Sequence, residues 1–200
     1  MTVPHPLAML TAEEIDVAVA AVKATGRLAD QALFASVVLH EPTKDALAAW
    51  SPGEPVDRRV RLVIVPGPEP TVVEAVVHIG SGEVESWAEV PDARPALLMT
   101  ESIMAILATR EHPDFLAALE RRGIPAERAS DVQIDPWPAG TFGYAAEEGR
   151  RLARCICFLR DSETDNGYAR PIEGLVVHFD LGRGEVVEVD RKSTRLNSSH

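Results

Sequence analysis

Histidine and cysteine are the side chains of this sequence best able to ligate a metal or to act as a nucleophile. The six histidines are spread along the whole chain: His5, His40, His78, His112, His178 and His200. No two of them are within four residues of each other, so the sequence has no His-x-His or His-x3-His pair of the kind found in metal sites. We therefore predict no metal site in this chain, and we interpret strand-borne histidines such as His78 and His178 as edge or surface residues.

The two cysteines, Cys155 and Cys157, are two positions apart in a segment that is expected to be a strand, so both thiols lie on one face. A disulfide between them would be strained, and two cysteines are too few for a disulfide framework. We interpret them as reduced thiols packed against a core, which fits a cytoplasmic location. A nucleophilic role for Cys155 would need a histidine or aspartate partner, and its strand position between Arg154 and Ile156 does not favour one.

The usual phosphate-binding and hydrolase motifs are absent from the sequence. No Gly-x-Gly-x-x-Gly opens a helix after a strand, and there is no Walker loop and no Gly-x-Ser-x-Gly elbow. Gly80-Ser81-Gly82 and Gly182-Arg183-Gly184 lie between predicted strands and indicate hairpin turns. The sequence thus predicts no catalytic residue, no cofactor-binding residue and no metal ligand in this chain.

Two segments in the second half of the chain are unusual because each presents an aromatic residue on an expected loop. Residues 135–140 bracket Trp137 with Pro136 and Pro138, and residues 165–174 form a polar stretch with Tyr168 as its aromatic residue. One interpretation is that Trp137 covers the sheet and that the second segment is a solvated turn. The alternative is that both loops dock on a partner, because aromatic and arginine side chains are enriched at interfaces.

Composition and charge narrow the class of protein. The chain has 200 residues, of which 46% are hydrophobic and 26% charged, an ordinary globular composition with room for one large or two small domains. The net charge of −11 repels phosphate backbones and anionic membrane surfaces, so we expect neither nucleic acid nor membrane as a partner. The apolar stretches are short and interrupted by charges, which predicts no transmembrane span, and the N-terminus lacks the features of a secretory signal.

The first half of the sequence predicts one helix followed by four strands. Thr11-Ala12-Glu13-Glu14 is a capping box, in which the N-cap and N3 side chains satisfy each other's backbone donors. Apolar residues then recur at helical spacing as far as Gly26: Ile15, Ala18, Val19 and Val22. Strands are expected at residues 33–40, 59–65, 71–79 and 83–90. In the last of these, Trp87 shares a face with three glutamates, which we interpret as a solvated face.

The second half repeats this order of elements. Residues 91–95 contain two prolines and predict a linker. A helix is expected from about Thr100, with Ile103, Ile106 and Leu107 on one face, and Pro113 begins a second helical piece that ends at Gly123. Strands are predicted at residues 132–134, 152–159, 175–181 and 185–189.

Together the two halves predict an α+β fold of two small domains, residues 5–92 and 96–190. Each domain is expected to be a helical layer on a curled antiparallel sheet of about four strands. Residues 191–200 are polar, lack periodicity and follow a complete strand. We interpret them as a disordered tail of non-native origin, such as a cloning or sequence-assembly scar.

Several motifs in the second half closely resemble the third N-terminal domain of copper-containing primary amine oxidases. They are Arg121-Arg122-Gly123-Ile124, residues 132–140 with Asp135-Pro136-Trp137, residues 149–154, and residues 166–175 with Asn166-Gly167-Tyr168. The opening, His5-Pro6-Leu7 followed by residues 10–15, resembles the preceding domain of the same enzymes. The resemblance covers residues 5–190, and it implies two small α+β domains of cystatin-like topology, in agreement with the repeated order of elements.

In that family the chemistry lies in a large C-terminal domain that this chain lacks. That domain holds copper on three histidines and a quinone made from a tyrosine in an Asn-Tyr-Asp/Glu motif, and it converts a primary amine, O2 and water to an aldehyde, ammonia and hydrogen peroxide. Here Tyr144 and Tyr168 each follow a glycine, so neither matches the quinone motif. The resemblance therefore implies a non-catalytic N-terminal region, inactive alone, whose copper and quinone cofactors belong to the full-length enzyme.

The resemblance also implies partners and a role for the two exposed aromatic residues. The chain would pack on the amine oxidase catalytic domain within a homodimeric enzyme, and the loops of Trp137 and Tyr168 would help to wall the channel through which the amine enters. The alternative is a free-standing cystatin-like binding module with no link to an oxidase. The detailed match of the loop motifs favours the first interpretation.

Overall fold

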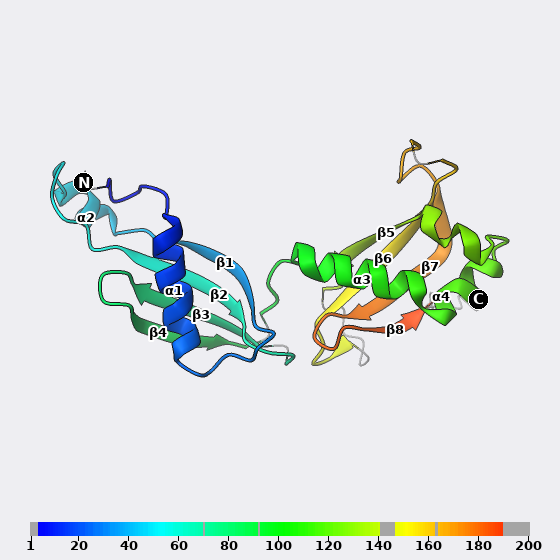
Figure 1. Cartoon of the computed structure of the whole chain (residues 1–200), viewed down its shortest axis with the longest axis horizontal. Helices are drawn as coiled ribbons and strands as arrows, with labels where there is room; N and C mark the ends of the chain where they lie inside the picture. Colours follow the sequence, from blue (N-terminus) through cyan, green and yellow to red (C-terminus); the bar gives the residue numbers. More distant parts are fainter. Residues whose placement is uncertain (1–3, 70, 92, 141–146, 163, 190–200) are drawn as a thin grey trace, which may run out of the picture. The chain divides into compact units, whose positions relative to one another are not determined.

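The computed structural model describes residues 4–69, 71–91, 93–140, 147–162 and 164–189. The chain divides into two compact units, Met1–Pro95 and Ala96–His200 (Figure 1). Each unit holds a four-stranded antiparallel sheet in which neighbouring strands follow one another in the sequence. The α+β class predicted from the sequence is thereby confirmed, whereas the predicted tail, residues 191–200, lies outside the described residues.

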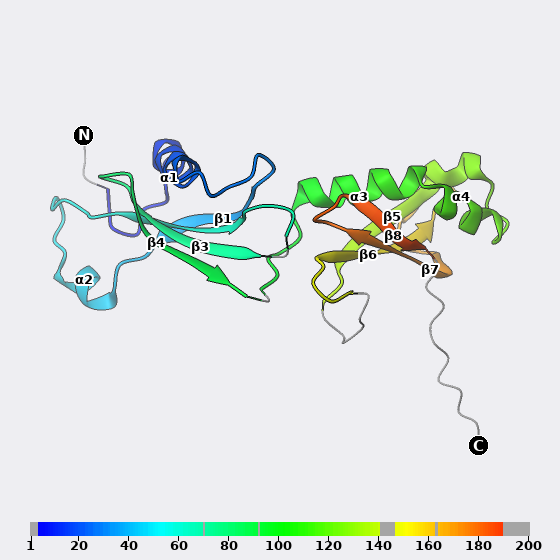
Figure 2. The ribbon, with the colours of Figure 1, turned by 90° about the horizontal axis from the view of Figure 1, so that it is seen from below.

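In the first unit, a helix covers one face of the sheet β1-β2-β3-β4 (Figure 2). The elements are α1 (Ala12–Ala24), β1 (Leu33–His40), α2 (Lys44–Ala49), β2 (Arg59–Val65), β3 (Val72–His78) and β4 (Glu83–Val90). The predicted capping box begins α1, since Thr11 Oγ1 accepts the Glu14 backbone N–H and the Glu14 carboxylate accepts the Thr11 N–H. Ala18 and Val22 of α1 are fully buried against the sheet. The short helix α2 was not predicted from the sequence.

The position of Trp87 differs from the sequence prediction because β4 contains a bulge. Val76 lies opposite Ser86 and Val77 lies opposite Val84, so Glu85 has no partner residue on β3. An extra residue of this kind shifts the alternation of side chains along the strand. Trp87 consequently packs against the core with Val84, and it does not lie on a solvated face with Glu83 and Glu85 as the sequence had predicted.

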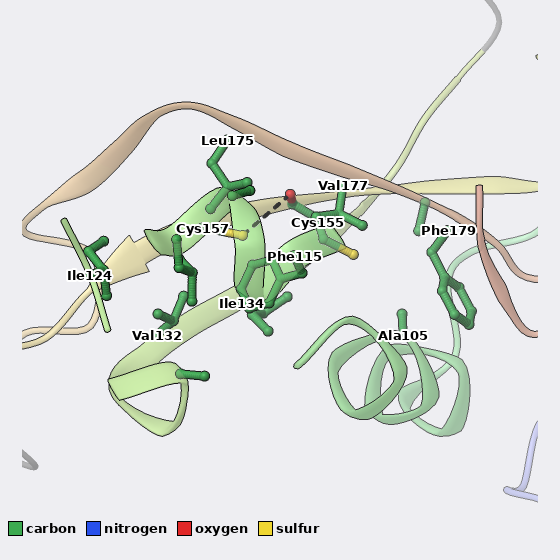
Figure 3. Packing of buried hydrophobic residues seen from close by; sticks show 14 of the residues in the cluster. Ala105, Phe115, Ile124, Val132, Ile134, Cys155, Cys157, Leu175, Val177 and Phe179 are labelled. Carbon is green, nitrogen blue, oxygen red and sulfur yellow. Dashed lines mark hydrogen bonds between the residues drawn. The ribbon is translucent and has the colours of Figure 1, made fainter. Parts of the chain in front are cut away.

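In the second unit, two helices lie over one face of the sheet β5-β6-β7-β8 (Figures 1 and 2). The elements are α3 (Met99–Glu111), α4 (Pro113–Glu120), the 3-10 helix η1 (Ala126–Asp131), β5 (Val132–Pro138), β6 (Leu152–Leu159), β7 (Pro171–Asp180) and β8 (Glu185–Val189). Fully buried residues of the helices, such as Ala105 and Phe115, pack on Ile134, Val177 and Phe179 of the sheet (Figure 3). Across the described residues, the helices are too short or too polar to cross a membrane.

The buried face of α3 is not the one that the sequence predicted. The residues that meet the sheet are Glu101, Ala105 and Thr109, whereas Ile103 and Leu107 are exposed. Of the predicted apolar face, Ile106 alone packs on the core. The buried carboxylate of Glu101 is bound by an arginine beside β6, and this pairing fixes which side of the helix turns inward.

Two strands of the second unit are longer than predicted. β5 continues through Pro136 to Pro138, and β7 begins at Pro171. Because β5 is an edge strand and Pro171 is the first residue of its strand, these prolines cost no central ladder hydrogen bond. Trp137 therefore lies on a strand and not on the loop that the sequence predicted.

Both units contain the same buried arginine–glutamate clamp. Arg58, just before β2, pairs with Glu14 at position N3 of α1, with 2.5 Å between Nε and Oε1. Arg151, just before β6, pairs with Glu101 at position N3 of α3, with 2.8 Å between Nη2 and Oε2. Each arginine also binds backbone carbonyls of the segment that precedes its helix, including those of Pro6 and Ala8 for Arg58 and, more weakly, that of Ala96 for Arg151.

Candidate functional site on the outer face of the second sheet

The two cysteines lie on the core face of β6, where both are fully buried (Figure 3). Burial raises the pKa of the Cys155 thiol to about 11, so this thiol is neutral at physiological pH. Cys157 Sγ lies 3.8 Å from the Cys155 carbonyl oxygen. The interpretation of both residues as thiols packed in a core is confirmed, and Cys155 is not an activated nucleophile.

Ser81, His78 and Asp57 have the residue types of a hydrolase triad, but His78 and Ser81 belong to the β3–β4 turn and Asp57 lies just before β2. His78 Nδ1 accepts the Ser81 backbone N–H at 3.0 Å and lies 2.8 Å from Ser81 Oγ, while Nε2 contacts Asp57. Asp57 also accepts a hydrogen bond from Arg59. The hydrogen bonds from His78 and, to a smaller extent, from Arg59 hold the pKa of Asp57 below its usual value. In the second unit, Asp180 takes the place of His78 and accepts backbone N–H groups of its own turn. We therefore assign His78 a structural role in the turn.

Trp137 lies on the outer face of the second sheet, away from the helices. Successive side chains of a strand point to opposite faces, so Trp137 points away from the face that carries Pro136 and the buried Ile134. Trp137 is 58% exposed. The indole Nε1–H donates a hydrogen bond of 2.8 Å to Asp135 Oδ2. Since residues two apart on a strand share a face, Asp135 holds the indole in place from the same side of the sheet.

Tyr168 lies in the connection between β6 and β7 and is 55% exposed. Its ring packs edge-on against Phe158, with 5.2 Å between ring centroids and an interplanar angle of 71°. Phe158 lies opposite Gln133 of β5, and a Cβ at Gly167 would come within 3.4 Å of the Gln133 side chain. Tyr168 and Trp137 are thus on the same face, separated by four positions along β5, or roughly 13 Å.

A polar row crosses the sheet next to Trp137. Trp137 lies opposite Arg154, Arg154 opposite His178, and His178 opposite Glu188. Arg154 forms an ion pair with the buried carboxylate of Glu147, and His178 Nδ1 is 3.7 Å from Glu188 Oε2. His178 is only 5% exposed and β7 has a strand on each side, so the interpretation of His178 as an edge or surface residue was wrong. Within the described residues, no group of three or more His, Cys, Asp or Glu side chains could hold a metal ion.

The outer face therefore combines exposed aromatic side chains with a polar row, an arrangement suited to recognition rather than bond breaking. Ile156, which is also exposed, lies between Trp137 and the Phe158–Tyr168 pair. Sequence reasoning found the two aromatic residues but missed Asp135 and Phe158, which hold them. The signal was the alternation along residues 132–138, which places Asp135 and Trp137 on one face if the segment is taken as a strand through its prolines.

Comparison with protein families finds a match for each unit. Residues 101–200 match the family described as copper amine oxidase, N3 domain, and residues 11–87 match the AGAO-like N2 domain. The two matches fall on either side of the division between the units at Pro95.

Curated relatives include primary amine oxidases from bacteria and a plant diamine oxidase. The chain is 38% identical to the primary amine oxidase of Arthrobacter sp. (strain P1) over 94% of its own length and 28% of the relative's length. It is 33% identical to the peroxisomal copper-containing diamine oxidase 1 of Nicotiana tabacum, covering 96% of this chain and 29% of the relative. The chain thus spans well under half of the relatives that it matches.

Solved structures show the same fold. A copper-containing benzylamine oxidase from Hansenula polymorpha superposes with a TM-score of 0.77 at 20% identity, over 94% of this chain and 30% of that one. Together with the sequence matches, this likeness shows that the chain belongs to the copper amine oxidase family, from which it carries two N-terminal domains of the N2 and N3 types.

Proposed function

We propose that this chain forms the part of a copper amine oxidase that packs on the catalytic domain and helps to wall the channel through which the amine enters. The observation that carries the proposal is the pair of exposed aromatic residues on one face of the second sheet, each held by a specific contact. The relatives are named for the oxidation of amines, and that reaction, with a homodimeric enzyme, is proposed for the full-length protein.

The family's copper and tyrosine-derived quinone do not fit the residues of this chain. Within the described residues no set of side chains converges as metal ligands, and Tyr168 follows Gly167 where the quinone motif requires asparagine. We therefore assign the oxidation chemistry to sequence outside these 200 residues. The roles left to this chain are to bind, to orient and to exclude water.

Trp137 can act on an amine before it reaches the reacting groups. Its exposed indole offers apolar area on which the organic part of the substrate can pack. Its ring face also attracts an ammonium group, and the Asp135 carboxylate adds to that attraction. Contacts of this kind change passage and selectivity, and they leave the bond-breaking step unchanged.

The test is a chimera in which residues 1–190 replace the matched segment of the Arthrobacter sp. relative. Trp137→Ala and Tyr168→Ala should each change the ratio of kcat/KM between bulky and small amines by about tenfold, the scale of one apolar contact. Val38→Ala is the matched control, because Val38 lies opposite Arg61 in the first sheet as Trp137 lies opposite Arg154 in the second. If Trp137→Ala and Tyr168→Ala unfold the second unit and leave the ranking of amines unchanged, both residues serve only in packing and the proposal is refuted.

A further inference from the structure

The outward side of α3 carries an exposed apolar stripe. It consists of Met99, Ile103, Met104 and Leu107, and Met99 is 75% exposed. The one charged residue of the helix before Arg110 is Glu101, which is buried and bound by Arg151. The stripe is therefore an uncharged apolar surface about two and a half helical turns long.

The corresponding helix of the first unit shows that the fold does not require this stripe. α1 and α3 both have 13 residues and a glutamate at N3. They bury the same two positions, Ala18 and Val22 in α1 and Ala105 and Thr109 in α3. At the positions of Ile103 and Leu107, however, α1 carries the exposed residues Asp16 and Ala20. An apolar residue at these positions thus contributes nothing that the helix needs in order to pack on its own sheet.

The stripe is also separate from the proposed channel wall. α3 covers the core face of the second sheet, whereas Trp137 projects from the outer face. The two surfaces therefore lie on opposite sides of the second unit, and a single flat partner cannot cover both.

We propose that the α3 stripe is a second docking face, covered by an apolar surface of the polypeptide that the longer relatives carry beyond the matched segment. This inference rests on the proposed function. The chain accounts for 28% of the Arthrobacter sp. relative, so most of that protein is available as the partner. Four side chains are far fewer than the roughly 20–30 residues a side of a stand-alone interface, which favours a tethered partner over a second copy of this chain.

Oxidation of methionine by dilute hydrogen peroxide tests the inference without measuring activity, because oxidation follows exposure of the thioether. Met9, which is 91% exposed in the first unit, is the internal reference. In the isolated 200-residue chain, Met99 should oxidise at nearly the rate of Met9. In the chimera with the Arthrobacter sp. relative, without added amine, Met99 should react about tenfold more slowly while Met9 is unchanged.

Substitutions in the stripe identify what protects Met99. Ile103→Lys and Leu107→Lys, at exposed positions, should leave the unfolding midpoint of the isolated chain unchanged and abolish the protection of Met99 in the chimera. Ala20→Lys at the matching position of α1 should leave that protection intact. Equal rates of oxidation of Met99 and Met9 in the chimera overturn the inference. The inference is also overturned if Met99 of the isolated chain becomes more protected as the protein concentration rises, because a second copy of the chain would then cover the stripe. If Met99 is protected in the chimera but Trp137→Ala leaves the ranking of amines by kcat/KM unchanged, the proposed channel-wall role is refuted and the docking face is not.

Discussion

The two units are built on one plan and differ on their outer surfaces. Each clamps the N3 glutamate of its main helix with a buried arginine, and in each the residue after the third strand donates its N–H to the carbonyl of that arginine. The hairpins also match, since Gly82 donates to His78 O at 2.9 Å and Gly184 donates to Asp180 O at 2.8 Å. These shared features specify the fold.

The differences lie on the surfaces that the fold leaves open. On the outer face of the first sheet, Val38, Arg61 and Val76 lie in one row, and in the second sheet the matching row is Trp137, Arg154 and His178. The outward side of the main helix differs as well, since Asp16 and Ala20 of α1 stand where α3 carries the exposed Ile103 and Leu107. Both differences are the basis for proposing that the second unit makes contacts with a partner.

Breaking the arginine–glutamate clamps should give the largest difference between the two units. Glu101→Gln leaves Arg151 buried without its counter-charge and should lower the free energy of unfolding of the second unit by about 3–5 kcal/mol. Glu14→Gln should cost the first unit about 1.5–3 kcal/mol, because Arg58 keeps several backbone carbonyl partners. Hydrogen exchange in increasing urea, followed separately for each unit, measures both. Equal losses in the two units would contradict the comparison.

The thiols report the second unit alone, because the first contains no cysteine. With full burial and a pKa of about 11 for Cys155, an aromatic disulfide reagent at about pH 8 should modify the native chain at least about 100-fold more slowly than the unfolded chain. Glu101→Gln should accelerate this modification, and Glu14→Gln should not. Rapid labelling of the native wild-type chain would show that the core of the second unit opens readily.

Acid should weaken the clamp of the first unit. The Arg58 hydrogen bond holds the pKa of Glu14 below its ordinary value of 4.5 in the folded chain. A lowered pKa stabilises the fold above that ordinary value, and the contribution is lost as the pH falls through the folded-state pKa. The difference in urea midpoint between wild type and Glu14→Gln should therefore be large at about pH 7 and small at about pH 3. A difference that does not change with pH would assign the effect to packing.

The sequence predicted those elements whose local pattern agrees with their tertiary surroundings. The capping box at Thr11 and the alternation of residues 59–65 involve neighbours in the chain, and both were found in the structure. Trp87 and Ile103 were placed wrongly because a bulge and a buried ion pair, neither visible in the periodicity, decide which way these side chains face. The short helix α2 was missed because it buries no residue and so has no apolar pattern.

The candidate site was predictable in part for the same reason. An exposed aromatic residue such as Trp137 stands out in the sequence, but its hydrogen-bond partner Asp135 is recognised only when the register of β5 is known. The buried arginine of each clamp was also missed. Its partner lies 44 residues away for Arg58 and 50 residues away for Arg151.

The smallest expected effect concerns Asp135, which positions Trp137. Asp135→Ala removes the acceptor for the indole N–H, and Asp135→Asn keeps an oxygen acceptor while it removes the charge. In the isolated chain each should change the free energy of unfolding by no more than about 0.5 kcal/mol, as is usual for surface substitutions. The indole N–H of Trp137 should exchange with solvent faster in Asp135→Ala than in Asp135→Asn.

In the chimera, Asp135→Ala should shift the amine ranking in the same direction as Trp137→Ala, by about threefold, because a loosely held indole gives a weaker contact. Asp135→Asn should retain the wild-type ranking if position alone matters, and it should weaken all amines alike if the carboxylate attracts the ammonium group directly. Ser36→Ala at the matching position of the first sheet is the control, since Ser36 lies opposite Val63 as Asp135 lies opposite Ile156. If Ser36→Ala and Asp135→Ala changed the ranking equally, the second sheet would have no special part in selecting the amine.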